Sequence, residues 1–168
     1  MTTPDVRLLQ WLRDAHAMEE QAITMLSSEA RRIENYPELK AQIERHLSET
    51  ERQRDRLEAC IERHNGGASA IKDTMAKMTA FGQAMSGLFV GDEVVKLGLV
   101  LSTFEHMEIA SYRILIATAE EAGDQETKRV CEEILREEEA MAKWAEDNLE
   151  PLTRAFLARE MEGASADR

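Results

Sequence analysis

The chain has 168 residues, enough for one well-packed domain and short for two, and 43% of them are hydrophobic while only 5% are aromatic. Its formal net charge of −12 argues against binding to nucleic acid or to an anionic membrane surface, since both are negatively charged. No stretch is long and apolar enough to span a membrane, no signal peptide opens the chain, and Cys60 and Cys131 lie inside helical patterns, so we expect a cytoplasmic protein.

The first predicted helix begins near Pro4 and runs to about Asn35, where an Asn-Tyr-Pro sequence interrupts it. Its apolar residues recur at steps of four and three, as a helix that buries one face requires. Glu19 falls in this apolar stripe, between two alanines. The pattern therefore predicts a buried carboxylate rather than a surface charge.

The second predicted helix begins near Pro37 and ends at Asn65 and the two glycines that follow it. The middle of its inward face is polar, because His46, Glu49 and Gln53 share that face. Residues 68–91 come next and are too many for a turn between neighbouring helices. We expect them to form a crossover that runs the length of a helical bundle.

The third predicted helix spans about Asp92 to Ala122 and has an apolar stripe along its whole length. Glu108 lies in the middle of that stripe, and Glu105 lies one turn earlier on nearly the same side. A buried charge without compensation costs at least several kcal/mol. A proton, a basic side chain or a metal cation must therefore neutralise Glu108.

The fourth predicted helix runs from about Gln125 to Asn148 and carries Glu137 in the middle of its seam. After Pro151, a short fifth helix is predicted to pack across one end of the bundle or onto a second subunit. The predicted fold is all-α: one four-helix-bundle domain over residues 1–162, with the crossover between the second and third helices. Residues 163–168 are predicted to be a disordered tail.

The two halves of the chain form a weak internal repeat that places acids at matching depths. Glu19 aligns with Glu108, and Glu49 aligns with Glu137. In an antiparallel bundle these four carboxylates would meet at one level, where two divalent ions would balance their charges. His46 offers a nitrogen ligand and Glu105 a fifth carboxylate, a donor set that suits iron or manganese, with zinc possible.

Two helical hairpins joined by a crossover, with one glutamate on each helix, resemble the ferritin-like di-metal carboxylate proteins. Within them, three motifs between Leu8 and Trp144 are similar to the YciE/YciF family of stress-associated ferritin-like proteins. These motifs are Asp14-x-x-x-x-Glu19-x-Gln21, His46-Leu-x-Glu49-Thr50-x-x-Gln53 and Glu105-His106-x-Glu108-Ile109-Ala110-Ser111-Tyr112. The resemblance implies a four-helix bundle, commonly a homodimer, with a di-metal site.

The chain departs from the family patterns at two places. The general ferritin-like pattern has Glu-x-x-His on its second and fourth helices, whereas His46 here precedes Glu49, as in the YciE/YciF pattern. That family often has an aspartate after the acids of the fourth helix, where this chain has Ala142. The ligand on the fourth helix is therefore Glu137 according to the repeat, with Glu138 as a competitor.

The predicted metal ligands come from all four long helices and are Glu19, His46, Glu49, Glu105, Glu108 and Glu137. The predicted function is that of a stress-associated oxidoreductase with two divalent ions, iron first, acting on a small inorganic substrate: ferrous iron, dioxygen or peroxide. The alternatives are a non-catalytic structural or interaction protein with a stabilising metal site, a metal-free bundle that docks partners through the crossover, and a relic site in which arginines such as Arg56 neutralise the acids.

Overall fold

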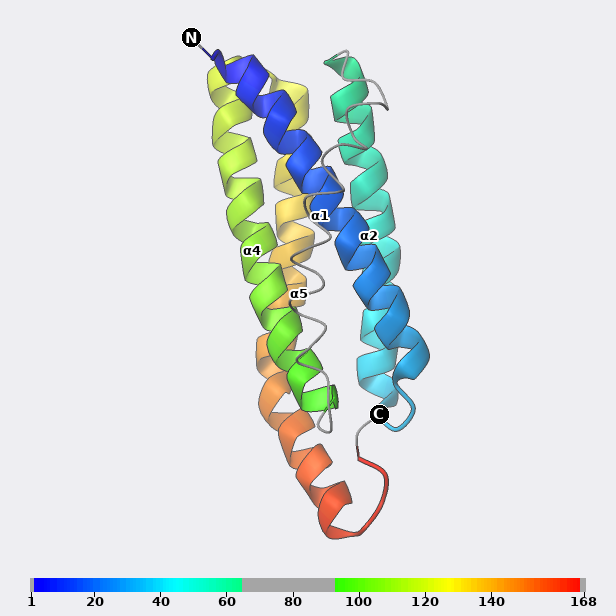
Figure 1. Ribbon diagram of the computed structural model, residues 1–168. Coiled ribbons are helices and arrows are strands. Elements are labelled where there is room, and N and C mark those ends of the chain that lie inside the picture. The colour runs from blue at the N-terminus through cyan, green and yellow to red at the C-terminus, as the bar shows by residue number, and fades with distance from the viewer. Residues whose placement is uncertain (1, 65–92, 167–168) are drawn as a thin grey trace.

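The computed structural model describes residues 2–64 and 93–166, which form four long helices and no strand (Figure 1). The helices are α1 (Pro4–Arg32), α2 (Pro37–Arg63), α4 (Glu93–Ala122) and α5 (Gln125–Met161). α1 packs against α2 and α4, and α4 packs along α5. The predicted all-α four-helix bundle is confirmed, while the predicted crossover, residues 68–91, lies outside the described residues.

The apolar stripes predicted from the sequence form the core between the helices. Leu8, Leu12 and Leu26 of α1 are at most 1% exposed, and Leu97 and Leu101 of α4 are fully buried. α1 ends close to where the Asn-Tyr-Pro sequence predicts a break, and α2 begins at the proline. The helical periodicity of the sequence therefore determines which face of each helix turns inward.

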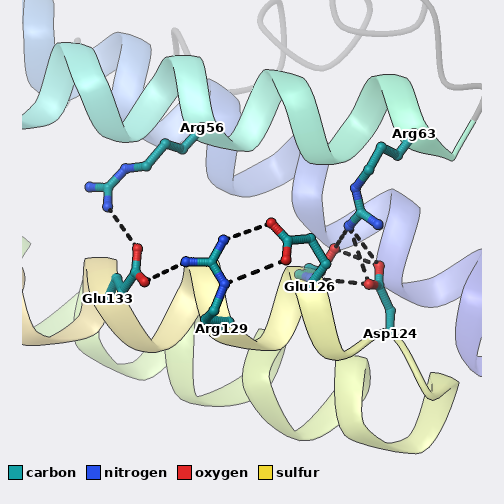
Figure 2. A network of polar contacts seen from close by, with 7 residues as sticks. Arg56, Arg63, Asp124, Glu126, Arg129 and Glu133 are labelled. Atoms are coloured by element: carbon teal, nitrogen blue, oxygen red, sulfur yellow. Dashed lines mark hydrogen bonds and ion pairs between the residues drawn. The ribbon is translucent and has the colours of Figure 1, made fainter.

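The turn between α4 and α5 is built around Gly123 and Asp124. Gly123 has φ +74°, a left-handed conformation that glycine adopts without steric cost. Asp124 caps α5 by accepting hydrogen bonds from the backbone N–H of Thr127 at 3.0 Å and from its hydroxyl at 2.5 Å. Arg63 at the end of α2 reaches the same carboxylate at 3.1 Å, which ties α2 to this turn (Figure 2).

We expect Asp124→Ala to lower the free energy of unfolding by about 1–2 kcal/mol at neutral pH. Burial alone would raise the pKa of Asp124, but hydrogen bonds from Thr127, His64 and Arg63 outweigh it and hold the pKa well below its usual value. This contribution is complete above the unfolded-state pKa of roughly 4 and is lost as the pH falls further toward the folded-state pKa. Urea unfolding of both proteins from pH 7 downward measures the difference, which should shrink below about pH 4; an equal difference at all pH values would contradict the assignment.

The predicted helix break at Pro151, and with it the separate short fifth helix, is wrong. α5 continues without interruption through Pro151 to Met161. A proline inside a helix removes one backbone hydrogen bond. Here the apolar seam continues beyond it: Leu152 packs against the core and Phe156 is only 6% exposed. Packing of this extension against the bundle outweighs the missing bond.

The C-terminal segment returns toward the turn between α1 and α2 (Figure 1). There the hydroxyl of Tyr36 donates a hydrogen bond of 2.6 Å to the carbonyl of Ala166. The predicted disorder of residues 163–168, the predicted homodimer and the cytoplasmic location stay predictions. No helix in the described part of the chain has a stretch long and apolar enough to cross a bilayer.

Candidate metal centre

A polar layer interrupts the apolar core near the middle of the bundle, and each of the four helices contributes to it. Its five titratable side chains are at most 1% exposed: Glu19 of α1, His46 of α2, Glu105 and Glu108 of α4, and Glu138 of α5. Three of the four carboxylates and the histidine lie at positions that the sequence predicts. We call these five side chains the core cluster.

The ligand atoms of four members of the core cluster lie close enough together to share a cation. One atom from each of His46, Glu105, Glu108 and Glu138 can be chosen so that all lie within 4.8 Å of one another. His46 Nε2 is 3.3 Å from an oxygen of Glu105 and 3.7 Å from an oxygen of Glu138. Three helices therefore converge on one point through these four side chains.

Glu19 joins the core cluster from α1 through Tyr112. The hydroxyl of Tyr112, which is fully buried, donates a hydrogen bond to Oε1 of Glu19. Tyr112 follows Glu108 by one helical turn, and this spacing places both residues on the same inward face of α4.

Two of the predicted ligands lie at the edge of the core cluster rather than in it. The side chain of Glu49 is 28% exposed, and its carboxylate contacts His46 Nδ1 at 3.4 Å. The side chain of Glu137 is 33% exposed and accepts hydrogen bonds from Arg56 and, at 2.9 Å, from Gln53 Nε2. α5 turns Glu138, the competitor, into the core cluster; the residue that binds a metal stays a prediction.

Burial controls the protonation of the core cluster. Burial first, opposed by the hydrogen bond from Tyr112 and by the charge of His46, raises the pKa of Glu19 to about 8. Burial and then neighbouring carboxylates raise the pKa of Glu108 and of Glu138 well above the ordinary value. Burial alone would lower the pKa of His46, but its contacts with Glu105 and Glu49 outweigh burial and raise it. Without a cation, the raised pKa values of Glu19, Glu108 and Glu138 favour their protonated, neutral forms at neutral pH.

The core cluster also lacks hydrogen-bond donors. Within the described residues, no N–H or hydroxyl group donates to Oε2 of Glu19, Oε2 of Glu105 or either oxygen of Glu108 and Glu138, and the contacts of Glu138 with Glu108 and Glu105 are hydrogen bonds only when one carboxyl of the pair holds a proton. Arg56, an arginine that could have neutralised the acids, pairs instead with Glu137 and, at 3.7 Å, with Glu133. Buried oxygens without donors are costly, and a multivalent cation would satisfy several of them at once.

The donor set of the core cluster therefore fits a metal ion. The four carboxylates are hard oxygen ligands and the imidazole is a borderline nitrogen ligand, a combination that suits iron and manganese sites in helical bundles. Two divalent ions would balance the four negative charges. The buried His/Glu group that could bind metal confirms the coarse prediction of a possible metal site.

Known families and structures are similar to this chain over nearly its whole length. The family described as "Domain of unknown function (DUF892)" matches residues 3–158. A crystal structure of a protein from Xanthomonas campestris pv. campestris is 40% identical, with a TM-score of 0.79, and the match covers 95% of this chain and 99% of that one. The E. coli stress protein YciF is 25% identical, with a TM-score of 0.75 and coverage of 89% and 96%. YcfI from Rhodopseudomonas palustris is 27% identical, with a TM-score of 0.67 and coverage of 86% and 93%.

Proposed function

This chain belongs to the DUF892 family and is a ferritin-like protein of the YciE/YciF type, and from that premise we propose that it is a di-metal carboxylate oxidoreductase. Two divalent ions, iron in the first place, would bind in the core cluster. The substrates would be small: ferrous iron is oxidised while dioxygen or a peroxide is reduced. The resemblance to a stress protein supports a role under stress.

The observation that carries this proposal is the buried, donor-poor set of acids. Glu19, Glu105, Glu108 and Glu138 come from three helices and yet meet in the core, where burial and neighbouring carboxylates raise the pKa of Glu108 and of Glu138. A cluster with no task would be expected to be replaced by apolar side chains, because such replacements are commonly neutral or stabilising. Cation binding would explain why these four acids are buried together.

Two hydrogen-bonded pairs, Tyr112 with Glu19 and Glu49 with His46, would orient side chains that hold the ions. Bound iron or manganese supplies a change of oxidation state and a Lewis-acidic centre, which protein side chains lack. Tyr112 orients Glu19 by donating to its Oε1, which leaves Oε2 available. When Glu49 accepts the proton of His46 Nδ1, the lone pair of Nε2 faces Glu105 and Glu138. The surrounding core keeps bulk water away from these oxygens.

Consumption of oxygen or peroxide on addition of ferrous iron tests the proposal. We expect Glu108→Ala to lower the rate on the order of 100-fold, because it removes a carboxylate of the core cluster. The matched control is Glu139→Gln on α5, a change at an exposed side chain whose ion pair among the described residues is with Arg113, and it should retain the wild-type rate. Wild-type protein that binds iron but shows no turnover with either oxidant would contradict a catalytic role.

A non-catalytic role is the second candidate, and the depth of the core cluster favours it. All five side chains are at most 1% exposed, so they are not open to the solvent from which a substrate would come. In this case the ions would serve only to stabilise the bundle. Metal-dependent stability without turnover is the result that distinguishes this candidate.

A further inference from the structure

Gln53 of α2 is a buried side chain whose carbonyl oxygen has no partner. The residue is 0% exposed, and its Nε2 donates a hydrogen bond of 2.9 Å to Glu137. Its Oε1 is buried and receives no hydrogen bond from the described residues. The reverse orientation of the amide would set two oxygens 2.9 Å apart, so the contact with Glu137 fixes which atom points away from it.

The neighbours of Gln53 place it at the level of two carboxylates of the core cluster. Arg54, the next residue, pairs at 3.1 Å with Glu20, the residue that follows Glu19. Glu137, which accepts from Gln53, precedes Glu138. Gln53 therefore lies between α1 and α5 at the depth where Glu19 and Glu138 turn inward.

Gln53 also shares the inward face of α2 with His46. The two residues are seven positions apart, which is two helical turns. Thr50, between them on the same face, turns its hydroxyl back to the carbonyl of His46 at 2.9 Å and is thereby satisfied. Gln53 thus shares this face with His46 and has a lone pair on Oε1 that no described residue uses.

We propose that Gln53 is a further ligand of the metal centre, with its Oε1 as a neutral oxygen donor; this rests on the proposed function. A carboxamide oxygen is a hard ligand that suits iron or manganese, and it adds no charge. That matters because four carboxylates already balance two divalent ions. Glu137 then acts as a positioning residue: it holds the Gln53 amide by its nitrogen, and Arg56 anchors Glu137 from α2.

Two measurements on the metal-free protein test this assignment: isothermal titration calorimetry gives the affinity for Mn²⁺, and scanning calorimetry gives the melting temperature. In Gln53→Leu one ion should bind about 10–100-fold more weakly, because a ligand is lost. The melting temperature of the metal-free variant should stay level or rise, since the change removes a buried oxygen that has no donor. A purely structural glutamine would show the opposite pattern, with lower stability and unchanged affinity.

Gln42→Leu is the matched control. Gln42 is also a buried glutamine of α2, but Arg45 donates to its Oε1 at 2.7 Å and its own Nε2 contacts the sulfur of Met141 at 3.3 Å. Its replacement should leave Mn²⁺ affinity unchanged and lower the melting temperature of the metal-free protein. Opposite responses at two glutamines of one helix would separate a ligand from a packing residue.

Three further variants keep the test decisive if Gln53→Leu fails to fold. Gln53→Glu keeps an oxygen donor, so it should bind Mn²⁺ at least as tightly as the wild type while its metal-free form melts at a lower temperature. Glu137→Ala should weaken binding, and Glu137→Gln, which keeps an acceptor for the Gln53 amide, should restore it. Wild-type binding of both ions by Gln53→Leu, or weaker binding by Gln53→Glu, would overturn the assignment, whereas a wild-type protein that binds no Mn²⁺ would overturn the proposed function itself.

Discussion

Addition of Mn²⁺ to the metal-free protein should raise its melting temperature by about 10 °C or more for each tightly bound ion. The physical reason is linkage: an ion at a thousand times its dissociation constant stabilises the folded state by about 4 kcal/mol if it does not bind the unfolded chain. In a domain of this size, 1 kcal/mol corresponds to roughly 2–4 °C. Here the ion would take the place of the protons that Glu19, Glu108 and Glu138 hold in the metal-free protein.

Scanning calorimetry at increasing Mn²⁺ concentration gives this measurement. Because the formal charge of the chain is −12, any salt will screen surface repulsion to some extent, so potassium chloride at matched ionic strength is the control. Screening changes smoothly with ionic strength, whereas binding at the core cluster saturates at a fixed ratio of ions to protein. A gradual shift that potassium chloride reproduces would mean that no such site is filled.

Glu108→Gln should act in opposite directions on metal binding and on the stability of the metal-free protein. Loss of a carboxylate from the core cluster should weaken Mn²⁺ binding on the order of 100-fold or more. The metal-free variant should be about 1–3 kcal/mol more stable than the metal-free wild type. The glutamine has nearly the same shape and, unlike Glu108, is neutral without taking up a proton, and its N–H₂ group can donate to the buried oxygens of Glu105 and Glu138.

Urea unfolding with and without Mn²⁺ measures both effects in one experiment. The matched control is again Glu139→Gln, the same chemical change one residue after Glu138 but at an exposed side chain. This control should alter neither quantity by more than about 0.5 kcal/mol. If Glu108→Gln lowers the stability of the metal-free protein, then Glu108 is held by structural contacts and the account of an uncompensated core cluster is incorrect.

The helices of the fold could be predicted from the sequence because their apolar residues follow a regular period. Leu8, Leu12 and Leu26 mark the buried face of α1, and Leu97 and Leu101 mark that of α4. Local signals failed at Pro151, where a proline normally ends a helix. The continuation of α5 depends on contacts with distant residues: a Cβ atom placed on Gly98 would lie 3.1 Å from a methyl carbon of Leu149, so α4 and α5 approach closely there.

The core cluster could be predicted where an acid interrupts a clear apolar stripe. Glu19, Glu105 and Glu108 satisfy that condition and are buried. Three consecutive glutamates on α5 offer no such contrast, and neighbouring residues on a helix point about 100° apart. The weak repeat favoured Glu137, whereas the rotation of α5 against its neighbours turns Glu138 inward, and only tertiary packing determines that rotation.

Long-range attraction also depends on where the acids lie. The four carboxylates of the core cluster belong to the formal charge of −12, yet protons or bound cations must cancel most of their charge in the folded state. The long-range attraction between the folded protein and a cation is therefore weaker than the composition implies. Screening with a Debye length of about 8 Å at physiological salt shortens the range of this attraction further. The association rate of a metal ion should therefore depend on the exposed acidic residues, whereas its dissociation rate should depend on the core cluster. The two rates could then be altered separately by mutation.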